Sequence, residues 1–99
     1  MSLHPHATFA FSPLHRLQWE EVQQRYVILY PEGMVELNVC AAEILKLCDG
    51  TLTLHDMTHS LETRFETTGL ASDIAELLEI ALQNGWITQA SASSRDTDE

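Results

Sequence analysis

The sequence predicts an α+β fold in which a three-stranded antiparallel sheet is followed by a bundle of three helices. Three short runs between residues 16 and 37 either alternate apolar and polar residues or are rich in β-branched and aromatic ones, which is typical of strands. Three segments between residues 38 and 84 then repeat apolar residues at helical spacing. Strands grouped before helices favour an α+β architecture. A three-helix core beside a small sheet is winged-helix-like.

The three predicted strands form a meander. Arg16–Glu20 alternates polar and apolar residues like a half-buried strand, and Arg25–Tyr30 is apolar enough to bury both faces. Pro31 and Gly33 mark a tight turn, because proline presets the first central turn position and glycine tolerates the bend. Residues 34–37 resume as a short strand. We expect this strand to lie at the sheet edge, where its unpaired N–H and C=O groups can be completed by a partner strand.

Capping residues delimit the three predicted helices. Asn38 is suited to cap the first helix, and the Asp-Gly pair at 49–50 is suited to end it. Residues 53–56 fit a capping box at the start of the second helix. Ser72 can cap the third helix, and Gly85 can terminate it. The predicted apolar stripes are Ala41, Ile44, Leu45 and Cys48; Leu54, Met57, Leu61 and Phe65; and Ile74, Leu77, Leu78 and Ala81.

Segments without periodicity flank this predicted core. Residues 1–13 carry two prolines and no sustained apolar period, so we interpret them as a flexible N-terminal arm. Residues 88–99 are rich in Ser, Ala, Thr, Asp and Glu, which predicts a disordered acidic tail. The folded domain is therefore expected at residues 14–87. A segment of that size can hold one modest core and has no room for a separate catalytic domain.

The charge balance restricts the binding partners. Fifteen acidic residues against five basic ones give a net charge of −10, which repels nucleic-acid phosphates and anionic lipid. The predicted third helix contains Asp73, Glu76 and Glu79 and no basic residue, whereas a helix that reads DNA needs Arg or Lys. We therefore expect no nucleic-acid partner. A winged-helix transcription regulator is kept as the alternative function.

Cysteine spacing and hydropathy indicate the compartment. Cys40 and Cys48 lie on the first predicted helix, separated by about 12 Å at a rise of about 1.5 Å per residue, which is too far for a disulfide. Reduced thiols are typical of a cytoplasmic protein. No stretch approaches the roughly 20 apolar residues of a membrane span, and no signal peptide is visible. We expect a cytoplasmic protein with no membrane partner.

The sequence offers little for catalysis or metal binding. His55 and His59 lie one helical turn apart, and Glu62 is the nearest third ligand, but we interpret these residues as part of a solvated helix face. No glycine-rich phosphate loop, nucleophile elbow or CxxC pair occurs. The sequence therefore predicts a protein that is not an enzyme and that needs no cofactor or metal.

Four segments of the chain are distinctive in combination: RLQWEEV at 16–22, YVILYPE at 26–32, AEIL at 42–45 and LCDG at 47–50. Together they resemble the PqqD family of pyrroloquinoline quinone (PQQ) biosynthesis proteins. The later spacing is also similar, with an amphipathic helix that ends near Phe65 and a last helix followed by Gly-Trp-Ile at 85–87. One local departure is that Gln18 and Glu20 stand where family members often carry Arg and Asp.

The resemblance implies a RiPP recognition element, which is a peptide chaperone that binds the precursor peptide PqqA and presents it to the radical SAM enzyme PqqE. Related elements take up the leader peptide as an added strand beside their third strand, in a groove closed by the third helix. The oligomeric state is left open, with a homodimer as one option. The peptide-binding residues that the resemblance implies are Met34, Val35, Glu36, Leu37, Asp73, Ile74, Leu77 and Ala81.

Overall fold

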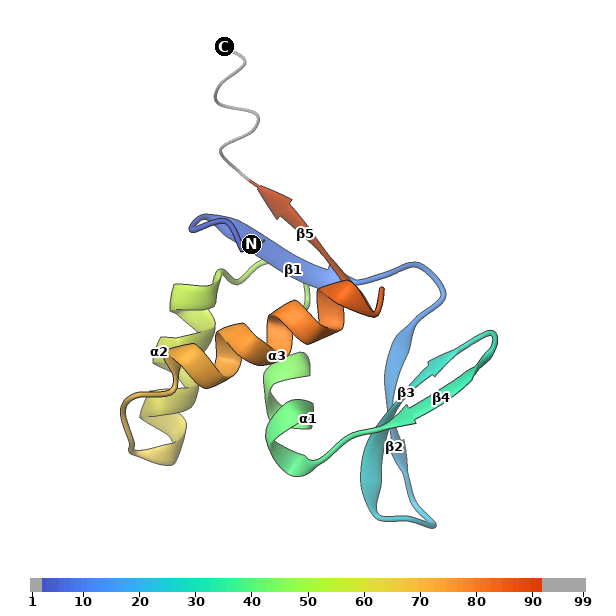
Figure 1. The fold of residues 1–99 in the computed structure, drawn as a ribbon. Coiled ribbons are helices and arrows are strands. Elements are labelled where there is room, and N and C mark those ends of the chain that lie inside the picture. The colour runs from blue at the N-terminus through green and yellow to red at the C-terminus, as the bar shows by residue number, and fades with distance from the viewer. Residues whose placement is uncertain (1–2, 92–99) are drawn as a thin grey trace.

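The computed structural model describes residues 3–91, and within them the chain forms three helices and five strands (Figure 1). These strands group into two antiparallel sheets, one of β2, β3 and β4 and one of β1 and β5. The predicted α+β class is therefore confirmed. The elements in chain order are β1 (Ala7–Phe11), β2 (Arg16–Glu20), β3 (Arg25–Tyr30), β4 (Gly33–Glu36), α1 (Val39–Leu45), α2 (Leu54–Phe65), α3 (Ala71–Gln83) and β5 (Ile87–Ser91).

The sheet β2–β3–β4 is the meander expected from the sequence. β3 pairs with β2 on one side and with β4 on the other, so that Ile28 lies opposite both Leu17 and Val35. These side chains share the core-facing side of the sheet, and Ile28 is completely buried. β4 spans Gly33–Glu36, so both of its ends lie one residue before the predicted ones. Within residues 3–91, β4 pairs with β3 alone and is an edge strand, as predicted.

The prediction of a flexible N-terminal arm is wrong for residues 7–11. Ala7–Phe11 forms β1 and pairs with β5, whose residues 88–91 fall within the predicted disordered tail. Phe9 is fully buried, and its carbonyl accepts a hydrogen bond from the backbone N–H of Gly50. Burial of the aromatic ring compensates for the entropy lost in ordering this short strand. The remainder of the predicted tail, residues 92–99, lies outside the described residues.

Helix α1 begins as predicted but ends early. The Asn38 side-chain oxygen accepts a hydrogen bond from the backbone N–H of Ala41 at 2.7 Å and so caps the helix. The helix ends at Leu45 and is followed by a tighter turn. In this turn the N–H of Cys48 donates to the carbonyl of Leu45, three residues back. Gly50 does have a left-handed φ of 93°, but it belongs to the loop that contacts β1 and does not end α1.

Helices α2 and α3 start in different ways. Thr53 and Asp56 form the reciprocal capping box predicted for α2. The predicted cap of α3 at Ser72 is wrong, because the N-cap residue is Leu70, two residues earlier, and its side chain makes no capping hydrogen bond. The backbone N–H of Leu70 instead donates to the Glu62 carboxylate of α2 at 2.9 Å. This bond ties the start of α3 to α2.

The hydrophobic core lies among the helices and is covered by both sheets. Figure 1 shows β1 and β5 crossing one side of the helical layer, while the β2–β3–β4 sheet lies beyond α1. Most of the predicted helical stripes face this core, whereas Phe65, at the end of α2, is 51% exposed. The largest fully buried side chains are Phe9, Val27, Ile28, Leu45, Met57, Ile74, Leu78 and Ile87.

Candidate functional site

The outer edge of β4 presents main-chain groups that no other strand within residues 3–91 pairs with. The backbone N–H of Leu37 donates to the Tyr26 carbonyl at 3.0 Å, which extends the β3–β4 register by one pair. Hydrogen-bonded and non-hydrogen-bonded pairs alternate in an antiparallel ladder, so Val35 also bonds inward to β3. Met34 and Glu36 therefore direct their N–H and C=O groups outward, where an added strand can reach them.

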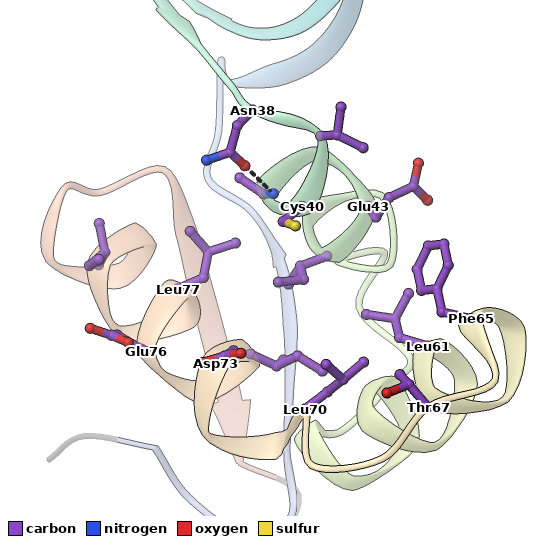
Figure 2. A pocket seen from close by; sticks show the side chains of 15 residues that line it. Asn38, Cys40, Glu43, Leu61, Phe65, Thr67, Leu70, Asp73, Glu76 and Leu77 are labelled. Atoms are coloured by element: carbon purple, nitrogen blue, oxygen red, sulfur yellow. Dashed lines mark hydrogen bonds between the residues drawn. The ribbon is translucent and has the colours of Figure 1, made fainter.

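An apolar pocket of about 540 Å³ follows β4 along the chain and lies between α1, α3 and the end of α2 (Figure 2). The chain leads from the edge strand directly into it, because Asn38 and Val39 line the pocket. Figure 2 shows Leu77 on α3 facing α1 across the cavity, with Leu61 and Phe65 contributed by α2. The volume falls within the roughly 300–1,000 Å³ that is usual for ligand sites.

The pocket has a buried floor and an exposed apolar rim. Ile44 and Ile74 belong to the core and form part of the floor. Val39, Phe65 and Ile80 line the same cavity but are 76%, 51% and 42% exposed. Large apolar side chains that stay in water around a concave apolar site mark a surface that binds a partner.

Charged side chains hold one wall of the pocket in place. The Glu43 carboxylate accepts hydrogen bonds from Lys46, the residue that directly follows α1, at 3.1 Å and from Arg64 of α2. The Arg64 guanidinium also lies over the Phe65 ring, 5.0 Å from its centroid. Both Glu43 and Phe65 line the pocket, so Arg64 links the parts of α1 and α2 that form this wall.

The residues implied by the resemblance fall into three groups. The structure places Met34, Val35 and Glu36 on β4, Asp73, Ile74 and Leu77 in the lining of the pocket, and Leu37 and Ala81 in the core away from it. The two core residues are 4% and 0% exposed, so their side chains support the site from behind. The edge strand and the pocket are consecutive along the chain, and the third helix supplies the wall facing α1.

Of the residues that line the pocket, the predicted peptide-binding set contained only Asp73, Ile74 and Leu77. The exposed lining residues that it missed include Val39, Cys40, Phe65, Glu76 and Ile80. Phe65 was assigned to the core stripe of α2, but it extends past the last buried turn. Val39 and Ile80 are apolar residues outside the predicted core stripes. An apolar residue on the polar side of a helix is the signal that could have indicated them, since helix surfaces normally keep such positions polar.

The two thiols have different environments. Cys40 is exposed and lines the pocket, whereas Cys48 is buried in the core. Burial, and to a smaller extent the negative charge of Asp49, together raise the pKa of the Cys48 thiol to about 12. Both cysteines are free. Of the two, Cys40 is therefore the thiol that a reagent in solution can reach.

Residues 3–91 contain no group of three or more His, Cys, Asp or Glu side chains placed to hold a metal ion. Glu62, the third ligand considered with His55 and His59, accepts the backbone N–H of Leu70 and so has a structural partner. No helix in this part of the chain combines the length and the apolar character needed to cross a membrane.

Comparison with known proteins identifies the family. The sequence model of the family described as coenzyme PQQ synthesis protein D (PqqD) matches residues 25–87. A protein of Methylococcus capsulatus named PqqA binding protein is 55% identical over 89 residues, which cover 90% of this chain and 96% of that protein. The chain belongs to the PqqD family. The PqqA binding protein of Acinetobacter baylyi is a further PqqD relative, 51% identical over 83% of this chain and 84% of its own length.

Two solved structures show the same fold as this PqqD family member. The first is the solution NMR structure of the PqqD truncation of Methylobacterium extorquens PqqCD, described as a stand-alone RiPP recognition element. It matches with a TM-score of 0.75 at 24% identity and covers 88% of this chain and 95% of that chain. The heterocyclase TruD matches with a TM-score of 0.65 at 16% identity, over 87% of this chain and 12% of its own length.

Proposed function

We propose that this chain is a non-catalytic peptide chaperone of PQQ biosynthesis, which binds the precursor peptide PqqA and presents it to the radical SAM enzyme PqqE. The observation that carries the proposal is the edge strand β4, whose outward main-chain groups at Met34 and Glu36 lie just before an apolar pocket along the chain. The names of the relatives, PqqA binding protein, support the choice of peptide.

In binding by strand addition, the main chain and the side chains contribute differently to affinity and selectivity. The peptide extends the β2–β3–β4 sheet through hydrogen bonds to β4, which supply affinity to any extended segment. Its apolar side chains then enter the pocket between α1 and α3, where shape and burial supply selectivity. In this proposal, Asp73 and Leu77 form the wall that α3 contributes, and Ile74 forms part of the floor. Val39 lies where the chain passes from β4 to the pocket.

The same proposal includes the type of fold and the cellular location of the protein. We infer that the sheet β2–β3–β4 beside α1, α2 and α3 is a winged-helix-like arrangement adapted to hold a peptide. We propose no reaction in the pocket, because its lining is apolar except for a few carboxylates and polar groups at the rim. Reduced, free cysteines support a cytoplasmic location. The alternative of a transcription regulator finds no support in α3, which carries three carboxylates and no cation.

The edge-strand site is tested by removing one outward main-chain donor. Glu36→Pro deletes an N–H that faces away from β3, and proline is tolerated on edge strands. We expect the variant to fold and to bind PqqA at least about tenfold more weakly, as loss of main-chain bonds and a misfitted strand would cause. Titration of isotope-labelled protein with PqqA, followed by NMR, measures both folding and affinity.

Glu36→Gln is the matched control, because it removes the carboxylate and keeps the N–H. The exposed ion pair of Glu36 with Arg25, at 3.4 Å, contributes little to stability, so this control should bind like the wild type. Val35→Pro should instead weaken the fold, because it deletes an N–H that bonds inward to β3. Normal PqqA binding by a folded Glu36→Pro protein would show that the peptide does not add to β4.

A further inference from the structure

Helix α3 presents acidic and apolar side chains on one face of the pocket. Asp73, Glu76, Leu77 and Ile80 all line the cavity, and their spacing places them on a single helical face. Leu77 is half-buried, whereas the two carboxylates are exposed at the rim. Figure 2 shows Asp73 and Glu76 on the same helix as Leu77, across from Asn38 and Cys40. An occupant of the pocket therefore meets apolar surface and negative charge together.

The charges of Asp73 and Glu76 are not balanced by any cation within residues 3–91. Every basic side chain in that part of the chain has another polar partner: Arg16 bonds Gln18, Arg25 pairs with Glu36, and Lys46 and Arg64 both pair with Glu43. The third carboxylate of the pocket, Glu43, is thus neutralised, whereas those of α3 are available to a ligand. Unpaired carboxylates beside an apolar surface attract a cation that a ligand brings with it.

The protein itself is a poor source of that cation. Residues 92–99 contain three acidic side chains and one arginine, so the end of this chain would be repelled from the rim. A second copy carries the same net charge of −10, which opposes its approach to an acidic groove. Charge complementarity therefore favours an occupant from a different molecule that is apolar and basic.

We propose that Asp73 and Glu76 select a peptide segment in which Lys or Arg lies next to bulky apolar residues. This inference rests on the proposed function and specifies the chemistry of the segment that enters the pocket. The apolar side chains fill the cavity floored by Ile44 and Ile74, while the basic side chain pairs with the rim carboxylates of α3. Because the rim is exposed to solvent, this pairing acts mainly on selectivity and association rate and is weakened by salt.

The test compares two doubly substituted proteins that lose the same charge. Asp73→Asn with Glu76→Gln neutralises the rim, whereas Glu20→Gln with Glu79→Gln removes two carboxylates that do not line the pocket. The probes are PqqA and a version of PqqA in which every Lys and Arg is replaced by Gln. Calorimetric titration at about 50 mM and about 300 mM NaCl measures how far the affinity for each peptide depends on charge pairing, because salt screens exposed charges. Asp73 also lies in the first turn of α3, where a negative charge favours the helix, so melting curves are recorded for each variant.

We expect the rim variant to bind PqqA about three- to tenfold more weakly than the wild type at low salt, as the loss of two exposed charge pairs predicts. Its affinity should be almost independent of salt and of the charge of the peptide. The control variant should behave like the wild type. Equal affinity and equal salt dependence in the rim variant and the wild type would overturn the inference.

The result also distinguishes this inference from the proposed function. If Glu36→Pro abolishes binding while the rim variant binds normally, strand addition stands and selection by charge is wrong. If the wild-type protein does not bind PqqA, the proposed function fails and the inference fails with it. A peptide without Lys or Arg that binds as tightly as PqqA at low salt also contradicts selection by Asp73 and Glu76.

Discussion

At the scale of single residues, the two cysteines report on the pocket and on the core. Cys40 is exposed beside the pocket, and Cys48 is buried with its pKa raised to about 12. Because the thiolate is the reactive species, a buried thiol that stays protonated reacts slowly. The pair therefore supplies a probe of pocket occupancy together with an internal reference in the same chain.

We expect N-ethylmaleimide at about pH 8 to modify Cys40 in the folded protein and to leave Cys48 largely unmodified, because Cys40 is exposed whereas Cys48 is buried and its pKa is raised to about 12. Saturating PqqA should slow the modification of Cys40, since the peptide covers the pocket. Peptide mass spectrometry over a time course measures both rates. In Cys40→Ser the fast reaction should disappear. Equal rates at the two cysteines, or a Cys40 rate unchanged by PqqA, would contradict this account of the site.

At the scale of elements, β1 joins the N-terminal part of the chain to the core, which its short, aperiodic sequence did not indicate. Its pairing partner, β5, begins at Ile87, so the two strands come from opposite ends of the domain. Phe9 is fully buried between them and the helices. The backbone of β1 is also joined to the loop at Gly50, through the bond from the Gly50 N–H to the Phe9 carbonyl. β1 is therefore an integral part of the fold.

Phe9→Ala should lower the free energy of unfolding by about 3–5 kcal/mol, which is the usual cost of deleting a buried aromatic ring. Urea unfolding measures this change. Phe11→Ala, at a partly buried position of the same strand, should cost less. Phe9 does not line the pocket, so the folded fraction of Phe9→Ala should keep its affinity for PqqA. An unchanged unfolding midpoint would mean that β1 is only loosely attached.

The starts of the helices show which structural features a local sequence pattern can predict. The N-caps of α1 and α2 are bonds between a side chain and a backbone N–H three residues away, Asn38 with Ala41 and Thr53 with Asp56, and both were predicted. The start of α3 depends instead on Glu62, eight residues away on another helix. A tertiary hydrogen bond of this kind leaves no local signature, and the predicted Ser72 cap was accordingly wrong.

At the scale of the whole molecule, the net charge of −10 decides which polymers the protein can approach. We expect no retention on heparin or on a DNA column at about 50 mM NaCl, because an acidic surface is repelled by phosphate and sulfate groups. The same sample should bind an anion-exchange resin, which serves as the control for a folded, acidic protein. Retention on DNA at low salt would favour the transcription regulator instead.

The candidate site combines features of two different origins. The sequence indicated the edge strand, because proline, glycine and alternating residues follow one another within residues 31–37. The pocket needs α1, α2 and α3 side by side, and Val39, Phe65 and Ile80 come together only in the folded chain. The bond between the Leu37 N–H and the Tyr26 carbonyl likewise shows that the main-chain groups of Met34 and Glu36 face outward from β4.

The sequence alone determined the α+β class, the strands Arg16–Glu20 and Arg25–Tyr30, and the acidic character of α3, because each depends on residues that are neighbours along the chain. Only the tertiary structure determined the pairing of β1 with β5, the exposure of Phe65, and the unbalanced charges of Asp73 and Glu76. These depend on contacts between segments that are distant in sequence, and such contacts arise when the whole core is buried at once.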